Sequence, residues 1–325
     1  MPAATRVAPA RKTPPRSASP AAPVAAPPSP KSSPKSSRGP KPLAGVRVLS
    51  LALNLPGPAA LMRCRQMGAT CVKLEAPAPA GDPMQAYAPH AYAQMHEGVR
   101  VIHGNLKTEE GQALLHRELA RTDVLLTSFR PSALTKLDLG WRKLSKLYPN
   151  LSQVAIVGAA GVRAEEPGHD LTYLAEHGLV PGLDLPATLY ADMSGSLMAS
   201  EAVLQAVLVQ RSKGKGTHIE VALADAARYV ALPRTWGLTL PAGAVGGAHA
   251  GYRVYPCKDG RVAVAALEPH FAAALCKAAG VHGVDLKGMM TKETRDIVAG
   301  FLLRQTRGQL ERLALAEDIP LLTMA

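Results

Sequence analysis

The chain contains 325 residues, of which 47% are hydrophobic and only 4% aromatic, and its formal net charge is +12. This length permits one large domain or two moderate ones. No apolar stretch approaches the roughly 18 residues of a membrane-spanning helix, and no apolar signal segment stands at the N-terminus. The composition therefore argues against a membrane span or a secretory signal and predicts a cytoplasmic protein.

The first 42 residues differ in composition from the rest of the chain. They hold eight Lys and Arg residues but neither Asp nor Glu, so they carry +8 of the net charge and leave +4 for the remainder. They are rich in Pro, Ala and Ser, and they cannot bury enough apolar surface to offset the entropy of ordering. We predict a disordered tail over 1–42 whose contacts with nucleic acid are at most weak and nonspecific.

From residue 43 onward, strands and helices are predicted to alternate. Near-continuous aliphatic runs predict buried strands at 45–53, 70–76, 123–129, 152–158 and 217–223. Helical patterns occupy 56–69, 108–122 and 190–212. Strands that alternate with helices predict a parallel sheet with crossover helices.

The regular alternation of strands and helices ends after the last of these strands. A flexible Gly- and Ala-rich loop is predicted at 241–251, and 252–267 reads as a hairpin closed by a Lys-Asp-Gly turn. Helices are predicted to fill 269–316. This pattern indicates a second, smaller α+β unit after the sheet.

The tripeptide Gly168-His169-Asp170 stands where an amphipathic helical pattern begins. An Asp near a helix start has an ordinary structural explanation, because it caps free N–H groups and complements the helix dipole. A histidine in this place is more often structural than catalytic, although a working site at the helix start would use the same residues. The tripeptide alone leaves both interpretations open.

Other chemical signatures are missing from the sequence. Gly214-Lys215-Gly216 lacks the spacing of a phosphate-binding P-loop, and the Gly-rich run at 246–251 does not join a strand to a helix. Neither the histidines nor the four cysteines have the spacing of metal ligands. We therefore expect no metal site, and cysteines that remain reduced thiols.

Five blocks in order resemble the family III CoA-transferases, a superfamily that also contains the 2-methylacyl-CoA racemases. The resemblance covers about 43–325. The blocks are "PLAGVRVLSLALNLPGPAALMRCRQMGATCVKLEAP", "ARTDVLLTSFRPSALTKLDLGWRKLSKLYPNL", "GHDLTYLAEHG", "ADMSGSLMASEAVLQAVLVQRSKGKGTHIEVALADAA" and "YRVYPCKDGRVAVAALEPHF". Several ordered blocks together are far more specific than any one of them.

The resemblance implies a Rossmann-like large domain with a parallel sheet over 43–224 and a smaller α+β domain over 225–325. It implies two chains interlocked as a homodimer, coenzyme A thioesters as substrates, and no permanently bound cofactor. Arg130, in a Phe-Arg-Pro turn, matches a CoA-contacting position, and Lys73 of the second strand is a further candidate for CoA binding. Relative to the family's pattern, we expect the C-terminal segment that returns to the large domain to be missing.

The resemblance also implies roles for the acid–base residues. In the racemase branch, His169 and Asp192 are the catalytic pair. Glu268 is expected to contact the histidine, either within one chain or from the other subunit. In the transferase branch, Asp170 is the nucleophile.

The residue types fit these chemistries. Racemisation needs a base on each face of the carbon next to the thioester carbonyl, with a pKa near the working pH. An imidazole and a carboxylate from separate elements meet this need, and free N–H groups at the helix start would stabilise the enolate oxygen. Transfer needs an exposed carboxylate that becomes acylated. His169 and Asp170 are adjacent and point in different directions on a helix, so one chemistry should dominate.

Because the chain holds His169, Asp192 and Glu268 together, we predict a racemase-like enzyme that acts on a 2-methylacyl-CoA. CoA transfer between carboxylic acids through Asp170 is the alternative. A divergent, inactive CoA-binding or interaction protein is a second alternative.

Overall fold

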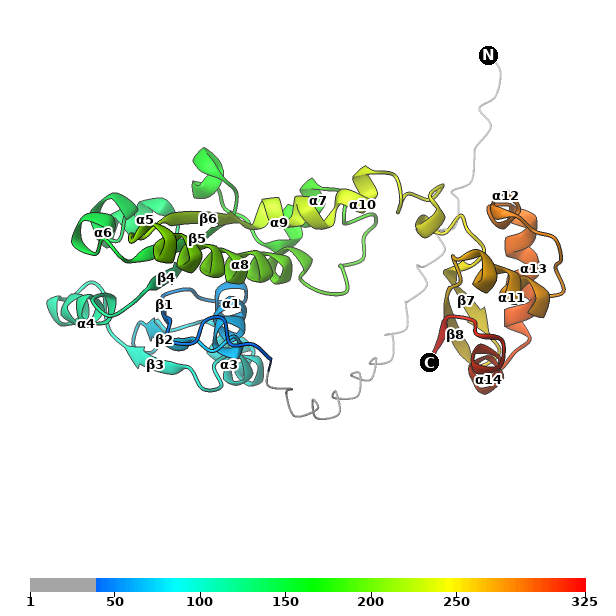
Figure 1. Ribbon diagram of the computed structural model, residues 1–325, viewed down its shortest axis with the longest axis horizontal. Coiled ribbons are helices and arrows are strands. Elements are labelled where there is room, and N and C mark those ends of the chain that lie inside the picture. The colour runs from blue at the N-terminus through cyan, green and yellow to red at the C-terminus, as the bar shows by residue number, and fades with distance from the viewer. Residues whose placement is uncertain (1–38) are drawn as a thin grey trace, which may run out of the picture. The chain divides into compact units, whose positions relative to one another are not determined.

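The computed structural model describes residues 39–325, so nearly all of the predicted tail over 1–42 lies outside the described residues. Within the described part, the chain forms a six-stranded sheet and a three-stranded sheet (Figure 1). Each sheet has its own hydrophobic core. The prediction of a mixed α/β protein with a large parallel sheet and a smaller α+β unit is confirmed.

The six-stranded sheet is parallel throughout and has the order β3-β2-β1-β4-β5-β6. This is a Rossmann-like order, which reverses direction between β1 and β4. The loops that follow these two strands therefore diverge and leave a crevice at the carboxyl edge of the sheet. The strands are β1 (Arg47–Ser50), β2 (Thr70–Glu75), β3 (Arg100–His103), β4 (Val124–Thr127), β5 (Ser152–Val157) and β6 (His218–Ala222).

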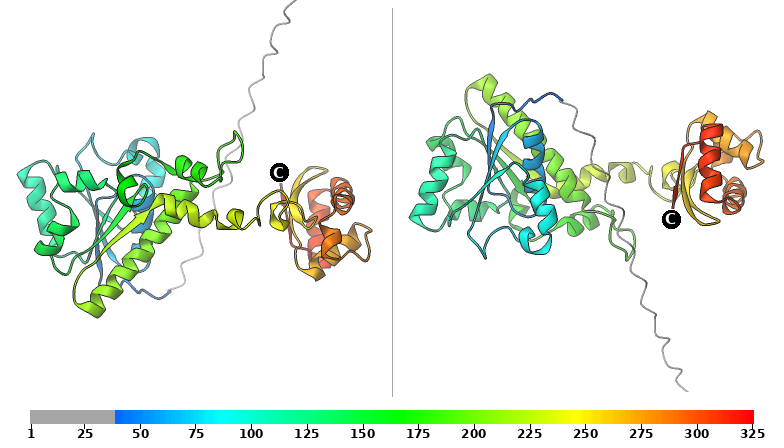
Figure 2. Two further views of the ribbon diagram at one scale, coloured as in Figure 1. Left: turned by 90° about the horizontal axis from the view of Figure 1, so that it is seen from above. Right: turned by 90° about the horizontal axis from the view of Figure 1, so that it is seen from below.

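Helices cover both faces of this sheet (Figure 2). Neighbouring strand residues therefore point into different cores, with Val124 on the α1 and α8 face and Leu125 on the opposite face. Burial on both faces explains why the strands read as continuous apolar runs. One face carries α1 (Pro56–Gln66) and α8 (Tyr190–Lys213), and the other carries α4 (Glu109–Leu119), α5 (Pro131–Lys136) and α6 (Trp141–Leu147).

Two further helices, α7 (Asp170–Glu176) and α9 (Leu223–Val230), pack against α8. Helices α8 and α9 can approach closely because Gly195 of α8 has no side chain. A Cβ at this position would collide with the Leu223 side chain of α9. The helix predicted to begin at Gly168-His169-Asp170 is thus present and is anchored to the long helix.

The small body is built on an antiparallel sheet of order β7-β8-β9. The predicted hairpin is confirmed, with β7 (Tyr252–Cys257) and β8 (Gly260–Ala265) joined at Lys258-Asp259. The predicted helices are present as well. They are α11 (Pro269–Ala278), α12 (Leu286–Met289), α13 (Lys292–Leu303) and α14 (Arg307–Glu317).

Two strands were not predicted. The edge strand β3 has the sequence RVIH, in which only two residues are apolar, because an edge strand needs less burial. Strand β9 (Leu321–Met324) pairs with β8 from about 60 residues away, and no local pattern signals such a pairing. The short helices α2 (Met84–Tyr87), α3 (Pro89–Met95) and α10 (Leu232–Thr235) and the 3-10 turns η1 (Gly161–Glu165) and η2 (Ala244–Gly246) complete the described chain.

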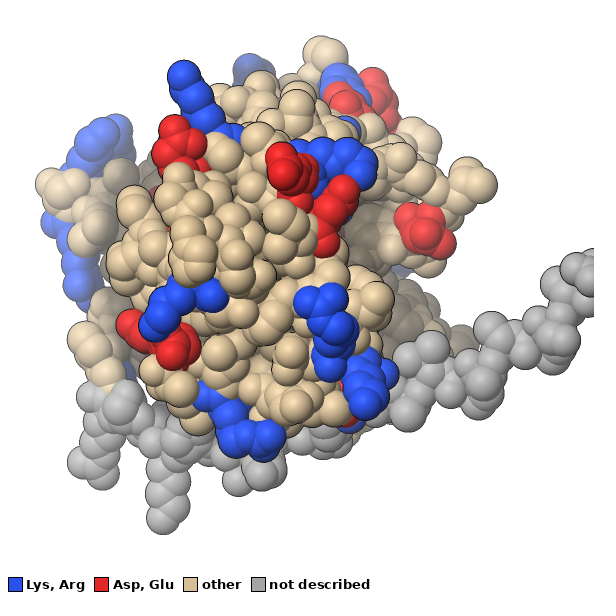
Figure 3. Space-filling model, turned by 90° about the vertical axis from the view of Figure 1, so that its right-hand side faces the viewer, with Lys and Arg blue, Asp and Glu red and all other residues tan. Residues whose placement is uncertain are grey.

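Between residues 39 and 325, no helix is long and apolar enough to cross a bilayer. The face in Figure 3 carries scattered basic and acidic side chains with uncharged surface between them. All four cysteines are buried free thiols. Burial raises the pKa of Cys64 to about 12, so this thiol stays protonated and unreactive.

A buried carboxylate ties the amino edge of the large sheet to α4. Glu118 is only 2% exposed, and it accepts hydrogen bonds from Arg47 of β1 at 2.7 Å, Arg100 of β3 at 2.9 Å and Arg121 at 2.6 Å. Burial alone would raise the pKa of Glu118, but the three guanidinium groups outweigh it and lower the pKa to about 2. This cluster lies at the edge opposite the crevice.

We predict that Glu118→Gln lowers the free energy of unfolding by about 3 kcal/mol at pH 7, because the variant loses the pairing that depresses the carboxyl pKa. A depressed pKa contributes stability above the unfolded value of 4.5 that is lost as the pH falls toward about 2. The difference between wild type and variant should therefore shrink over that window in urea titrations. The exposed Glu97→Gln is the control, and an equal loss in both variants would contradict the prediction.

Candidate active site

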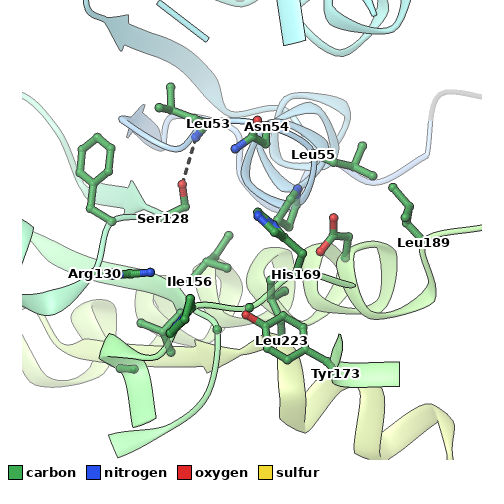
Figure 4. A pocket seen from close by; sticks show the side chains of 18 of the residues that line it. Leu53, Asn54, Leu55, Ser128, Arg130, Ile156, His169, Tyr173, Leu189 and Leu223 are labelled. Carbon is green, nitrogen blue, oxygen red and sulfur yellow. Dashed lines mark hydrogen bonds between the residues drawn. The ribbon is translucent and has the colours of Figure 1, made fainter. Parts of the chain in front are cut away.

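A cavity of about 610 Å³ opens at the carboxyl ends of β1, β4 and β5. Its wall includes the loop after β1, the loop after β4 and the end of β5, together with the starts of α7 and α8 (Figure 4). The cavity therefore lies where the strand order reverses. Open parallel sheets bind their ligands at this place, because the connecting loops leave in opposite directions.

Four helices begin at the cavity wall. Leu55 precedes α1, Arg130 precedes α5, His169 precedes α7 and Leu189 precedes α8, and all four residues line the cavity. The start of a helix carries partial positive charge from its free N–H groups. The wall therefore favours a ligand, or a reaction intermediate, that bears negative charge.

Three of the residues singled out in the sequence meet in this cavity: His169, Asp192 and Arg130. His169 comes from the start of α7, Asp192 from the first turn of α8, and Arg130 from the loop after β4. Figure 4 shows the side chains of His169 and Arg130 projecting into the same space. An imidazole and a carboxylate from separate helices thus face one volume, as proton transfer requires.

The backbone of His169 is fixed by one neighbour. The hydroxyl of Thr172 accepts a hydrogen bond from the His169 N–H at 3.1 Å and donates one to the His169 carbonyl at 2.7 Å. Both bonds use the main chain. The imidazole itself lines the cavity.

Asp170 does not line the cavity. Its side chain is 5% exposed, and its Oδ1 accepts a hydrogen bond from the backbone N–H of Asp192 at 2.9 Å. Asp170 therefore satisfies a free donor in the first turn of α8, as a capping group does. The bond links α7 to α8 and keeps His169 and Asp192 on the same side.

The carboxyl group of Asp192 is unusually basic. Burial raises its pKa, and the nearby Asp170 carboxylate raises it further, whereas His169 lowers it. The result is a pKa of about 6 for Asp192. A carboxylate of this basicity is ionised near neutral pH and can still accept a proton during reaction.

The third acid–base residue expected from the sequence is Glu268. It precedes α11 in the small body, its side chain is exposed, and it is not among the lining residues. The expected contact between Glu268 and His169 therefore stays a prediction.

Comparison with known proteins gives the family. Residues 43–323 match the model of CoA-transferase family III. The chain belongs to this family. The prediction of an acyl-CoA enzyme of this superfamily is thereby confirmed.

Individual relatives include both chemistries of family III. The alpha-methylacyl-CoA racemase of Mus musculus is 30% identical over 267 residues, which cover 77% of this chain and 68% of the racemase. The cinnamoyl-CoA:phenyllactate CoA-transferase of Clostridium sporogenes is 31% identical over 209 residues, covering 57% and 50%. A crystal structure of a hypothetical protein from Mycobacterium tuberculosis shares the fold, with a TM-score of 0.74, 24% identity, and coverage of 88% of this chain and 86% of that one.

Lys73 of this family III chain lies inside the protein rather than on the cavity wall. Its fully buried Nζ is 2.6 Å from Asp82 Oδ2, 2.9 Å from Glu75 Oε1 and 3.0 Å from His96 Nε2. His96 Nδ1 is 2.7 Å from the carbonyl oxygen of Tyr92, so Nδ1 carries the proton and Nε2 accepts from Lys73. The three N–H donors of the ammonium group thus meet three acceptors.

This buried cluster also holds part of the cavity wall in place through Asp82. Asp82 Oδ1 accepts hydrogen bonds from the N–H groups of Asn54 at 3.1 Å and Met84 at 3.0 Å, and both residues line the cavity. Asn54 has a φ of 62°, a left-handed conformation that Asn tolerates better than most residues. Lys73 therefore acts on the wall through Asp82, and its direct contact with CoA stays a prediction.

Sequence reasoning missed Asp82 and His96, which lie 9 and 23 residues from Lys73. The available signal was Lys73 itself, because a lysine within an apolar strand is almost never fully buried without paired charges. Within residues 39–325, no group of three or more His, Cys, Asp or Glu side chains is placed to hold a metal ion.

We predict that Asp192→Asn stabilises the fold, because it removes a buried charge whose pKa is raised. The folded state binds the Asp192 proton more tightly than the unfolded state does, so the wild type loses stability as the pH rises from 3.8 through about 6. At pH 7 the variant should gain up to about 3 kcal/mol in free energy of unfolding. Chemical denaturation at pH 7 and pH 4 checks this, and a variant less stable than wild type at pH 7 would refute it.

Proposed function

We propose that this family III protein removes and returns the proton on the carbon next to the carbonyl of a 2-methylacyl-CoA thioester. The proposal rests on the different orientations of the adjacent residues His169 and Asp170 at the start of α7. His169 faces the cavity together with Asp192, whereas the Asp170 carboxylate is buried and bonded to the N–H of Asp192. The 30% identity to an alpha-methylacyl-CoA racemase supports it.

The reaction would use His169 and Asp192 as opposed acid and base. In one direction, the Asp192 carboxylate takes the α-proton, and the C–H electron pair moves into the carbon–carbon bond of an enolate. The imidazolium of His169 then gives a proton to the opposite face. In the other direction the two groups exchange roles. The pKa of Asp192, about 6, suits a group that must both accept and release a proton.

The remainder of the cavity fits a CoA thioester. The helix starts at the wall place partial positive charge where the enolate oxygen becomes negative. Arg130 adds a full positive charge at the rim, and a guanidinium group suits the phosphates of CoA. The apolar lining residues, among them Leu53, Ile156 and Leu223, would contact the acyl chain.

CoA transfer requires a different arrangement of the same helix start. The Asp170 carboxylate would have to leave the Asp192 N–H and enter the cavity before it could be acylated. The relationship to a CoA-transferase keeps this chemistry as the alternative.

We predict that His169→Ala and Asp192→Asn each reduce the rate of epimerisation at the α-carbon by about 10²–10⁴-fold, because inversion needs both proton-transfer groups and each variant removes one. Asp170→Asn should have a much smaller effect, since the amide oxygen can still accept the Asp192 N–H. Chiral chromatography of a single-epimer 2-methylacyl-CoA after incubation gives the readout. Asp225→Asn is the control, because this surface residue of α9 pairs with Arg228 outside the cavity.

Three other outcomes would overturn the proposal. Loss of acyl exchange with added carboxylates in Asp170→Asn, with His169→Ala nearly normal, would show that the protein is a transferase. Full epimerisation by His169→Ala would remove the histidine from the mechanism. CoA-ester binding by the wild type without any turnover would indicate a non-catalytic binding protein.

We further propose that the working unit is a homodimer in which Glu268 reaches His169 of the other subunit. Glu268 is exposed and is not among the residues that line the cavity. The start of α8 also exposes Tyr190, Met193 and Leu197 to solvent at 46%, 41% and 50%. These positions recur at helical spacing, and an apolar stripe beside a functional site favours a protein interface.

Complementation would test this assembly. Mixing His169→Ala and Glu268→Gln chains after denaturation should restore about one quarter of wild-type activity, because half of the dimers would be mixed and hold one complete site. Light scattering should show a dimer. A stable monomer, or a mixture as inactive as its components, would show that Glu268 does not act across subunits.

A further inference from the structure

Tyr173 lies on α7 one turn after His169, and both residues line the cavity. His169 caps the helix and Tyr173 lies on it, and the phenol and the imidazole reach the wall of the same cavity. The Tyr173 side chain is only 7% exposed. The side-chain hydrogen bonds around α7 in residues 39–325 involve Thr172 and Asp170 but not the Tyr173 hydroxyl. The hydroxyl is thus not engaged by another side chain of the described residues, and it is not among their fully buried unpaired atoms, so it is open to the cavity.

Two glycines make room for this hydroxyl. A Cβ built on Gly158, at the end of β5, would collide with the hydroxyl oxygen, and one built on Gly168 would lie 2.6 Å from it. Neither glycine has a positive φ, so their need to lack a side chain is steric rather than conformational. Both also line the cavity. The fold thus keeps a narrow slot for the hydroxyl at the edge of the space that His169 and Asp192 share.

We propose that the Tyr173 hydroxyl donates a hydrogen bond to the carbonyl oxygen of the bound acyl thioester. The bond strengthens as this oxygen becomes negative in the enolate, which makes Tyr173 a catalytic residue. This inference rests on the proposed proton-transfer function of the same cavity. The phenol proton stays on Tyr173 throughout, because the proton that moves is the one on the α-carbon.

Other donors on the wall are less suited to this role. The hydroxyl oxygen of Ser128 already accepts the Leu53 N–H at 3.0 Å, which fixes its place in the loop after β4 (Figure 4). Arg130 is exposed at the rim. Burial and the nearby Asp192 carboxylate raise the pKa of Tyr173, so the phenol remains a neutral donor when Asp192 is ionised. A neutral buried donor stabilises a developing oxyanion at little desolvation cost.

Tyr173→Phe tests the proposal because it removes only the hydroxyl. We expect kcat for α-proton exchange to fall by about 10²–10³-fold and KM to rise only about fivefold, since the bond gains strength mainly in the transition state. The melting temperature should change little. Tyr229→Phe is the matched control, because Tyr229 is 67% exposed on α9 and lies outside the cavity lining. Equal activity of the two variants would overturn the proposal.

A binding comparison separates this inference from the proposed function. Tyr173→Phe should weaken binding of an acyl-CoA thioester about fivefold, but should not weaken the matched S-alkyl-CoA thioether, which lacks the carbonyl oxygen. Calorimetry measures both affinities even if the wild type catalyses no exchange, in which case the proposed function alone fails. Equal weakening of the two ligands, or of neither, would overturn the role of the hydroxyl.

A double substitution tests the slot itself. Gly158→Ala should lower the melting temperature in the Tyr173 background, because the new methyl group collides with the hydroxyl. In the Tyr173→Phe background the nearest ring atom would be Cζ at 3.3 Å, so the loss should be much smaller. Non-additivity of this kind reports direct contact. An equal loss in both backgrounds would show that the hydroxyl does not occupy the slot.

Discussion

The arrangement of the site depends on one hydrogen bond, from the N–H of Asp192 to Oδ1 of Asp170. It joins the first turn of α8 to the first turn of α7, and it therefore sets His169 and Asp192 into one cavity. It also holds a second carboxylate near Asp192, which adds to burial in raising the pKa of that group to about 6. A single contact between two helix starts thus connects the two groups of the site, and it adds to the basicity that burial gives Asp192.

The site combines several features that cost stability. A carboxyl group with a raised pKa, a left-handed Asn54 and a fully buried Lys73 all lie at or behind the same wall. Such features persist only where the surrounding structure determines them strongly. Here the Lys73 ammonium has an acceptor for each proton, and the apolar cores on both faces of the sheet fix the strands from which these groups project. The Glu118 cluster at the opposite edge adds further support.

Two adjacent residues at the start of α7, His169 and Asp170, belong to the two chemistries considered for this site. His169 is the proposed proton-transfer group, and Asp170 is the nucleophile of the alternative CoA transfer. His169 stands before the first turn of α7 and faces the cavity, whereas Asp170 begins the helix and turns toward α8. A base needs access to the substrate, and a capping carboxylate needs a donor, so the two roles suit the two directions. This division supports the proposed proton transfer over the alternative acylation of Asp170, and Tyr173 lines the same cavity as His169.

The sequence by itself determined the family, the parallel sheet and the helix start at His169, because long apolar runs and ordered motifs are local properties of the chain. It did not determine which way Asp170 and Lys73 point. Their partners, Asp192, Asp82 and His96, lie 9 to 23 residues away, and burial depends on packing between elements. The same holds for the Tyr173 slot, which requires Gly158 from a strand and Gly168 from a loop to meet. Tertiary structure decided these features because only packing brings distant side chains within contact distance.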